Sequence, residues 1–114
     1  MYRGTTPTIT IRCDMDVALL EAIWVTFCVV RKGIYNAENQ VEITKEMGED
    51  GMDVNGETIT VSLTQAETLL LGSLDPERKQ TVEVQVRARA VDGRAYASQV
   101  MTTSICRILR DGEI

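Results

Sequence analysis

The sequence contains no histidine, and aromatic residues make up only 4% of it. Without histidine, the Ser-His and Cys-His nucleophilic pairs and the commonest zinc ligand are excluded. The chain also lacks a glycine-rich phosphate loop and a Gly-x-Ser-x-Gly elbow. Its 17 acidic residues show no spacing that selects two of them for acid–base catalysis. We therefore expect no enzyme activity, no catalytic residue and no cofactor.

Nucleic acids and membranes are also unexpected partners. Scarce aromatic residues argue against stacking on bases or sugars, and a formal net charge of −5 argues against binding through phosphates. The longest apolar segment, residues 22–30, is much shorter than a membrane span and is interrupted by Thr26. The first residues contain no apolar stretch typical of a secretory signal. These features predict a soluble protein that binds neither nucleic acid nor a membrane.

The three cysteines, Cys13, Cys28 and Cys106, form no Cys-x-x-Cys pair and are odd in number. Each lies in an apolar stretch, where a reduced thiol acts as a small hydrophobic side chain. We expect three buried, reduced thiols, which suits a reducing cytoplasm. A disulfide between two of them is the alternative.

The strongest structural pattern surrounds Asp92-Gly93. Before this pair, apolar residues alternate with charged and amide residues, which is the period of a half-buried β-strand. Asp-Gly favours a two-residue type I′ turn, in which both central residues need a positive φ. The sequence therefore predicts an antiparallel hairpin. Its expected pairs are Ala90 with Ala95, Ala88 with Ala97, Val84 with Met101, and Val82 with Thr103.

Alternating residues elsewhere predict further strands over 8–13, 23–30 and 58–63, and a shorter one over 41–43. The strand over 23–30 is expected to be central in its sheet, because both of its faces are partly apolar. Asn55-Gly56 is a second dipeptide typical of a type I′ hairpin turn. The chain thus reads as a succession of short strands joined by tight turns.

A single short helix is expected near 64–71, where a capping-box pattern opens it and where it would cross between two sheets. Together with about seven short strands, this predicts an all-β fold: an antiparallel β-sandwich, immunoglobulin-like in outline. We expect an extended N-terminal arm over residues 1–7, one sandwich domain over 8–109 and a frayed tail over 110–114.

The stretch over residues 36–57 is acidic, and Lys45 is its one basic residue. The Asp-x-Asn-Gly fragment that begins at Asp53 resembles part of a calcium loop. An EF-hand, however, needs an oxygen ligand where Gly51 stands and a bidentate glutamate where Ser62 stands. A solvated acidic loop is favoured and no metal ligand is assigned, while cation binding by this loop stays open.

Three residues of the predicted sandwich are candidate binding residues. Trp24 is the only tryptophan, and it is either part of the core or an interface anchor. Arg87 and Arg89 lie on the outward face of a predicted strand. They either meet a carboxylate surface of a partner or form a charged exterior that protects a sheet edge.

Three pieces carry a family resemblance: residues 3–8 (RGTTPT), residues 59–68 (ITVSLTQAET) and the hairpin from 82 to 98. Together they resemble small structural proteins encoded among the structural genes of phages and prophages of Gram-positive gut bacteria. The likeness spans nearly the whole chain, and the acidic insertion around 36–53 is the departure. The resemblance implies a virion structural or accessory protein of the capsid, connector, tail or baseplate. It also implies assembly in the host cytoplasm, with other virion proteins or copies of itself as partners, in a homo-oligomer within the particle.

The arm is the segment best suited to contact a neighbouring subunit, because an extended segment can add a strand to another sheet. Its candidate interface residues are Arg3, Thr5, Thr6 and Pro7. We expect the arm to order only in the assembled particle, so that its deletion abolishes incorporation without lowering the melting temperature of the monomer. The alternative function is a stand-alone immunoglobulin-like binding module that recognises a bacterial surface or a host factor.

Overall fold

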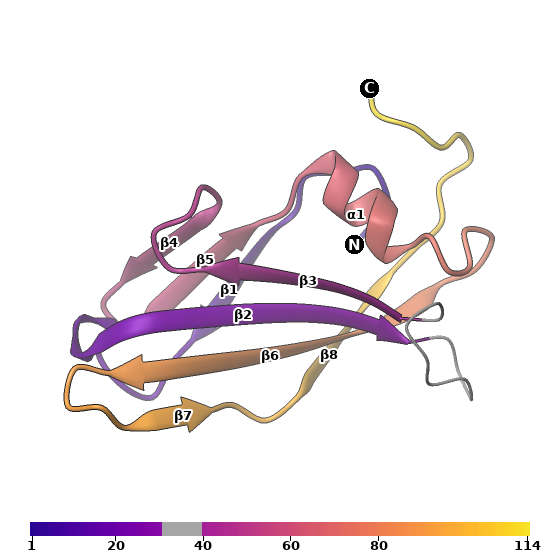
Figure 1. The fold of residues 1–114 in the computed structure, drawn as a ribbon. Helices are drawn as coiled ribbons and strands as arrows, with labels where there is room; N and C mark the ends of the chain where they lie inside the picture. Colours follow the sequence, from indigo (N-terminus) through magenta and orange to yellow (C-terminus); the bar gives the residue numbers. More distant parts are fainter. Residues whose placement is uncertain (31–39) are drawn as a thin grey trace.

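The computed structural model describes residues 1–30 and 40–114. One sheet contains three strands and the other five, and the two sheets pack face to face around a shared apolar core (Figure 1). The predicted antiparallel β-sandwich is therefore confirmed. The strands are β1 (Thr8–Arg12), β2 (Leu20–Val30), β3 (Gln40–Glu46), β4 (Met52–Asn55), β5 (Thr58–Ser62), β6 (Gln80–Ala90), β7 (Ala95–Ala97) and β8 (Met101–Ile105). The helical elements are η1 (Val17–Leu19), a 3-10 turn, and α1 (Gln65–Leu71).

The strand order corresponds to an immunoglobulin-like sandwich. In that fold, strands B, E and D are neighbours in one sheet, and C, F and G are neighbours in the other, with C′ added beside C. Here β1-β5-β4 occupies the places of B-E-D, and β3-β2-β6 followed by β7 and β8 occupies those of C′-C-F-G. Among the described residues, no strand pairs with the outer edge of β1, where strand A would lie.

Alternating side chains of both sheets fill the space between them, as predicted. Ile23, Val25 and Phe27 of β2 are fully buried, and so are Ile59 and Val61 of β5. Each such side chain contributes about 1.5–3 kcal/mol by leaving water. β2 lies between β3 and β6, so its predicted central position is also confirmed.

The hairpin at Asp92-Gly93 is present, but the predicted turn type is wrong. A backbone hydrogen bond from Ala90 closes a loop of three residues in place of two. Gly93 has a φ of 90°, whereas Asp92 does not have the positive φ that a type I′ turn requires. A three-residue loop that ends on a left-handed glycine is another common hairpin connection. As a result, Ala95 pairs with Arg89, one residue away from its predicted partner.

The predicted register returns in β8, where Val84 pairs with Met101. Between β7 and β8, segment 98–100 has one more residue than the part of β6 opposite it, which is the geometry of a β-bulge. Ser98 holds the bulge: the Val86 N–H donates to its hydroxyl at 3.0 Å, and its own N–H donates to the Val86 carbonyl at 2.8 Å. The bulge divides the last predicted strand in two, which explains one strand more than expected.

The second predicted hairpin joins β4 to β5, again with a different turn. Asn55 pairs with Thr58, so the loop is Gly56-Glu57 and Asn55 belongs to the strand. Gly56 has a φ of 62°, and neither neighbour has a positive φ. This is the pattern of a type II′ turn, in which glycine occupies the first central position.

The helix α1 crosses from β5 to β6, as predicted, and begins with the predicted capping box. The Glu67 N–H donates to Thr64 Oγ1 at 3.2 Å, and the Thr64 N–H donates to Glu67 Oε1 at 2.8 Å. The Glu67 carboxylate also lies 2.8 Å from Lys45 Nζ, which ties β3 to the helix. Burial alone would raise the pKa of Glu67, but the contacts with Lys45 and Thr64 together outweigh it and lower that pKa.

Candidate protein-binding face

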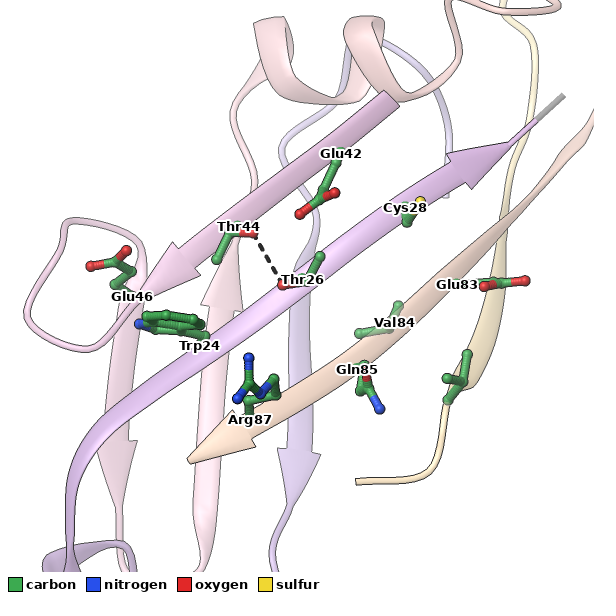
Figure 2. Close-up of a pocket in the computed structure, with 11 residues that line it drawn as sticks. Trp24, Thr26, Cys28, Glu42, Thr44, Glu46, Glu83, Val84, Gln85 and Arg87 are labelled. Carbon is green, nitrogen blue, oxygen red and sulfur yellow. Dashed lines mark hydrogen bonds between the residues drawn. The ribbon is translucent and has the colours of Figure 1, made fainter. Parts of the chain in front are cut away.

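The outer face of the five-stranded sheet points away from the core and carries the candidate site (Figure 2). Successive side chains of a strand point to opposite sides, so alternate residues of β2, β3 and β6 share this face. With Val84 and Val100, these residues line a shallow depression of about 470 Å³. The outer face is defined here as Trp24, Thr26, Cys28, Glu42, Thr44, Glu46, Glu83, Gln85 and Arg87.

Trp24 is the largest side chain on the outer face and is 45% exposed. Its cross-strand neighbours are Glu46 on β3 and Arg87 on β6. The guanidinium carbon of Arg87 lies 5.5 Å from the centre of the Trp24 ring, within the range of a cation–π contact. Figure 2 shows the two side chains next to each other on the face. The contact holds an indole ring in place that still presents much of its surface to water.

Charge is unevenly distributed over the outer face. Cys28 lies between Glu42 and Glu83, so one end of the face carries a row of carboxylates. The middle row is neutral, and there the hydroxyls of Thr26 and Thr44 lie 3.1 Å apart (Figure 2). A protein that covers this face would therefore need an apolar group over the indole ring and basic groups toward the acidic end.

No protein-family model and no curated protein matches this chain. A functional proposal therefore depends on the geometry of the site and on the chemistry of its residues. Within the described part of the chain, no helix is long and apolar enough to cross a membrane.

Arg89, the next outward residue of β6, has a partner within the chain. Its Nε lies 2.6 Å from Glu21 Oε1, and both side chains remain about half exposed to solvent. This favours the alternative in which Arg89 is part of an ordinary charged exterior. Among the predicted binding residues of the sandwich, Trp24 and Arg87 thus contact each other, whereas Arg89 forms an ion pair with Glu21.

The arm predicted to reach a neighbouring subunit is bound to its own chain. Tyr2 pairs in parallel with Cys106, directly after β8, and the Arg3 N–H donates to the Cys106 carbonyl at 3.1 Å. The Arg3 side chain is buried, forms an ion pair of 2.6 Å with Asp111 and donates to the Leu69 carbonyl at 3.1 Å. The arm finds an open strand edge within its own sandwich, so a neighbouring subunit is not required to order it.

The other arm residues also contact their own chain. Thr68 Oγ1 donates to the Thr5 carbonyl at 2.9 Å, and the Leu63 N–H donates to the Pro7 carbonyl at 3.0 Å. Thr6 is exposed. Arg3, Thr5 and Pro7 thus contact their own chain, and their role at an interface stays a prediction.

The C-terminal tail, which is predicted to be frayed, also contacts its own chain. The Ile114 N–H donates to Gln65 Oε1 at 2.7 Å, and Gln65 Nε2 donates to the Ile114 carbonyl at 3.1 Å. With the ion pair between Arg3 and Asp111, these contacts fasten the tail to α1 and to the arm.

The acidic stretch, in which the sequence predicts a strand over 41–43, forms β3 and β4 for much of its length, and its residues 36–39 lie outside the described residues. Asp53 is exposed on β4, beside the hairpin turn. Within residues 1–30 and 40–114, no group of three or more Cys, Asp or Glu side chains gathers in a way that could hold a metal ion.

The three cysteines are free, so the predicted reduced thiols are present and the alternative of a disulfide is not. Each cysteine is only half-buried, whereas buried thiols were expected. Burial is the main cause that raises the pKa of Cys13 and Cys28, and neighbouring carboxylates raise it further. Because a thiolate is the reactive form, both thiols are poor nucleophiles at neutral pH.

The contribution of β3 to the outer face was not predicted from the sequence. Glu42, Thr44 and Glu46 stand beside Trp24 and Cys28 because β3 pairs with β2 in antiparallel register. The alternation within β3 was the available signal. Alternation shows which residues share a face, but it does not identify the neighbouring strand.

Proposed function

We propose that this chain is a structural or accessory protein of a phage virion that acts by protein–protein assembly, with the outer face as its docking surface. The observation that supports docking is Trp24, which stands 45% exposed on a sheet face and against Arg87. Trp and Arg are among the residue types that most often dominate the binding energy of protein interfaces. A partner that covers the ring would gain about 25 cal/mol for each Å² of apolar surface removed from water.

The virion assignment is supported by the resemblance of residues 3–8, 59–68 and 82–98 to phage structural proteins. A virion protein of this kind works by shape and contact, which agrees with a candidate site made of a sheet face. Its partners would be other virion proteins or further copies of itself, joined during assembly in the host cytoplasm. The carboxylate row at Glu42 and Glu83 favours a neighbour that presents basic residues.

Mass spectrometry of purified virions, with Trp24→Ala as the variant, tests both parts of this proposal. The wild-type chain should be found in the particles, and the variant should be lost from them while remaining folded. Leu70→Ala is the matched control, because Leu70 is 50% exposed on α1, away from the outer face. Absence of the wild-type chain from particles would contradict the virion role. Normal incorporation of the Trp24 variant would contradict the docking face.

A stand-alone binding module is the second candidate, and the bound arm favours it. The arm and tail already contact their own chain, so neither needs a neighbouring subunit to hold it in place. Such a module would be missing from purified particles and would capture a protein of the bacterial surface or of the host. Capture that depends on Trp24 would favour this second function over the first.

A further inference from the structure

The strand β1 leaves one side of its sheet open. It pairs with β5 alone among the described strands. At the two ends of the β1–β5 ladder, the Leu63 N–H donates to the Pro7 carbonyl and the Cys13 N–H donates to the Glu57 carbonyl. The odd-numbered residues of β1 therefore direct their backbone groups toward β5. By that alternation, the backbone N–H and carbonyl groups of Thr8, Thr10 and Arg12 point away from β5, toward the open side. Another extended backbone can pair with such a row of groups in regular order.

An apolar groove lies beside this open edge, between β1 and the β7–β8 edge of the opposite sheet. Its volume is about 270 Å³. Tyr96 and Met101 line its far side and remain 40% and 38% exposed. Ile11 lines its near side and is only half-buried, although it faces the interior. The groove lies where strand A of an immunoglobulin-like sheet would cover the core.

The edge also lacks the features that usually prevent strand pairing. Charged residues, prolines or bulges commonly protect exposed edges. Two other edge strands carry such charges. β4, at the other edge of the same sheet, carries Asp53, and β3, at an edge of the five-stranded sheet, carries Glu42 and Glu46. Within β1, the one charged residue is Arg12, at the end of the strand.

We propose that β1 pairs antiparallel with β1 of a second copy, about a two-fold axis at Thr10. In this register Thr10 faces Thr10 of the second copy, and Thr8 faces Arg12. All the open backbone groups of the strand are then paired. The inward side chains of the second strand, Ile9 and Ile11, enter the groove and cover Tyr96 and Met101. The two three-stranded sheets become one continuous sheet.

A second copy is the occupant that best fits the edge. The strand alternates Thr and Ile, so its own sequence supplies apolar side chains on the groove side and polar ones on the outside. The antiparallel arrangement places the two Arg12 residues at opposite ends, so no like charges meet. A two-fold dimer also needs one self-complementary surface, which an unprotected antiparallel edge provides. This inference concerns a surface distinct from the outer face and does not depend on the proposed virion role.

Sedimentation equilibrium with Thr10→Lys and Thr10→Val tests the pairing. The wild-type chain is expected to be a dimer at submillimolar concentration. Thr10→Lys should make it monomeric, because two ammonium groups would face each other across the axis. Thr10→Val keeps the shape and β-propensity and should remain dimeric. Circular dichroism and melting should show both variants folded, since the Thr10 side chain is exposed.

Cross-linking tests the register. Opposite residues of a hydrogen-bonded antiparallel pair have Cα atoms about 5.5 Å apart, which is within the range of a disulfide. Thr10→Cys should therefore form a covalent dimer under mild oxidation. Thr102→Cys, exposed on β8, is the matched control and should not exceed the wild-type level. A monomeric wild-type chain, a dimeric Thr10→Lys variant or equal cross-linking of both cysteine variants would overturn the proposal.

Discussion

The N-terminal arm and the outer face of the five-stranded sheet both carry polar and aromatic groups, yet they differ in where those groups find partners. Arg3 is 6% exposed and its guanidinium contacts Asp111 and the Leu69 carbonyl. Trp24 is 45% exposed, and its cation–π contact is with Arg87 on the same face. The arm closes the sandwich, while the outer face stays open to solvent.

This difference shows that residue type does not reveal whether a side chain serves the fold or a partner. An arginine near a chain end and a tryptophan in a strand were both candidate interface residues. The partner of Arg3 stands 108 positions later in the chain, so no local pattern could identify it. Stability measurements should therefore separate the two regions, with large effects at the arm and small ones at the outer face.

Among changes to the arm and the outer face, deletion of residues 1–7 should have the largest effect. It removes the pairing of the arm with residues 104–106, the buried Arg3 side chain and the contact with Thr68. Several lost hydrogen bonds and the lost ion pair with the half-exposed Asp111 should together lower the free energy of unfolding by about 2–4 kcal/mol. Urea unfolding measures the change. Thr6→Ala, at an exposed position, should change it by less than about 0.5 kcal/mol. An unchanged midpoint for the deletion would show that the arm is not part of the fold.

Gly72→Ala should have the next largest effect. It tests the packing of the arm by placing an additional methyl group against the Arg3 side chain. A methyl group at Gly72 would collide with the middle of the Arg3 side chain, which Asp111 holds in place. Overpacking of this kind costs about 1–3 kcal/mol. In the background of the arm deletion, the same substitution should cost much less, because the colliding side chain is gone. If the substitution lowered the free energy of unfolding equally in both backgrounds, the collision with Arg3 would not be the cause of the loss.

Acidification should weaken the link between α1 and β3. The pKa of Glu67 in the folded chain lies below its ordinary value of 4.5, so the ionised carboxylate stabilises the fold at neutral pH. That stabilisation is fully present above the unfolded-state pKa and is lost as the pH falls through the folded-state pKa. The stability difference between wild type and Glu67→Gln should therefore be largest near neutral pH and shrink below about pH 4. If the stability difference between the two proteins did not change with pH, the ionised contact with Lys45 could not be its cause.

Trp24→Ala should have the smallest effect on stability. Because the ring is already partly in water and its cation–π contact is exposed, the expected loss is about 1 kcal/mol or less. Phe27→Ala, on the buried side of the same strand, should cost about 3–5 kcal/mol. Thermal or urea unfolding of the two variants gives the comparison. A large loss for Trp24 would identify it as a core residue and remove the support for a docking face.

Much of the fold follows from local patterns. The alternation of Ile23, Val25 and Phe27 selects the inner face of β2, because period-two burial is a property of the strand itself. The capping box at Thr64 and Glu67 locates the start of α1 for a similarly local reason. These features need no knowledge of distant residues, and the structure confirms them.

Turn type and strand partners follow less directly. Asp-Gly suits a two-residue turn and also a three-residue loop with Gly93 in the left-handed region. The choice between them depends on how β7 pairs with β6, and thus on tertiary packing. The candidate site was predicted in part for the same reason. Trp24 and Arg87 were visible in the sequence, but the residues that β3 places beside them depend on a strand pairing.

The bulge at Ser98 has a consequence for how side chains are oriented along the last ribbon. In β7 the even-numbered Tyr96 lies on the inner side with Ala88, whereas in β8 the odd-numbered Met101 and Ile105 do so. The additional residue therefore resets the phase of the alternation halfway along the ribbon. Without the additional residue, the ladder would be uninterrupted, and Tyr96 and Ile105 could not both face inward. If Tyr96 kept its inward position, Thr102 and Ser104 would face the interior in place of Ile105. If Ile105 kept its inward position, Tyr96 would point outward into water. Because of this single additional residue, the same ribbon places Tyr96 in the groove at one end and Ile105 in the core at the other.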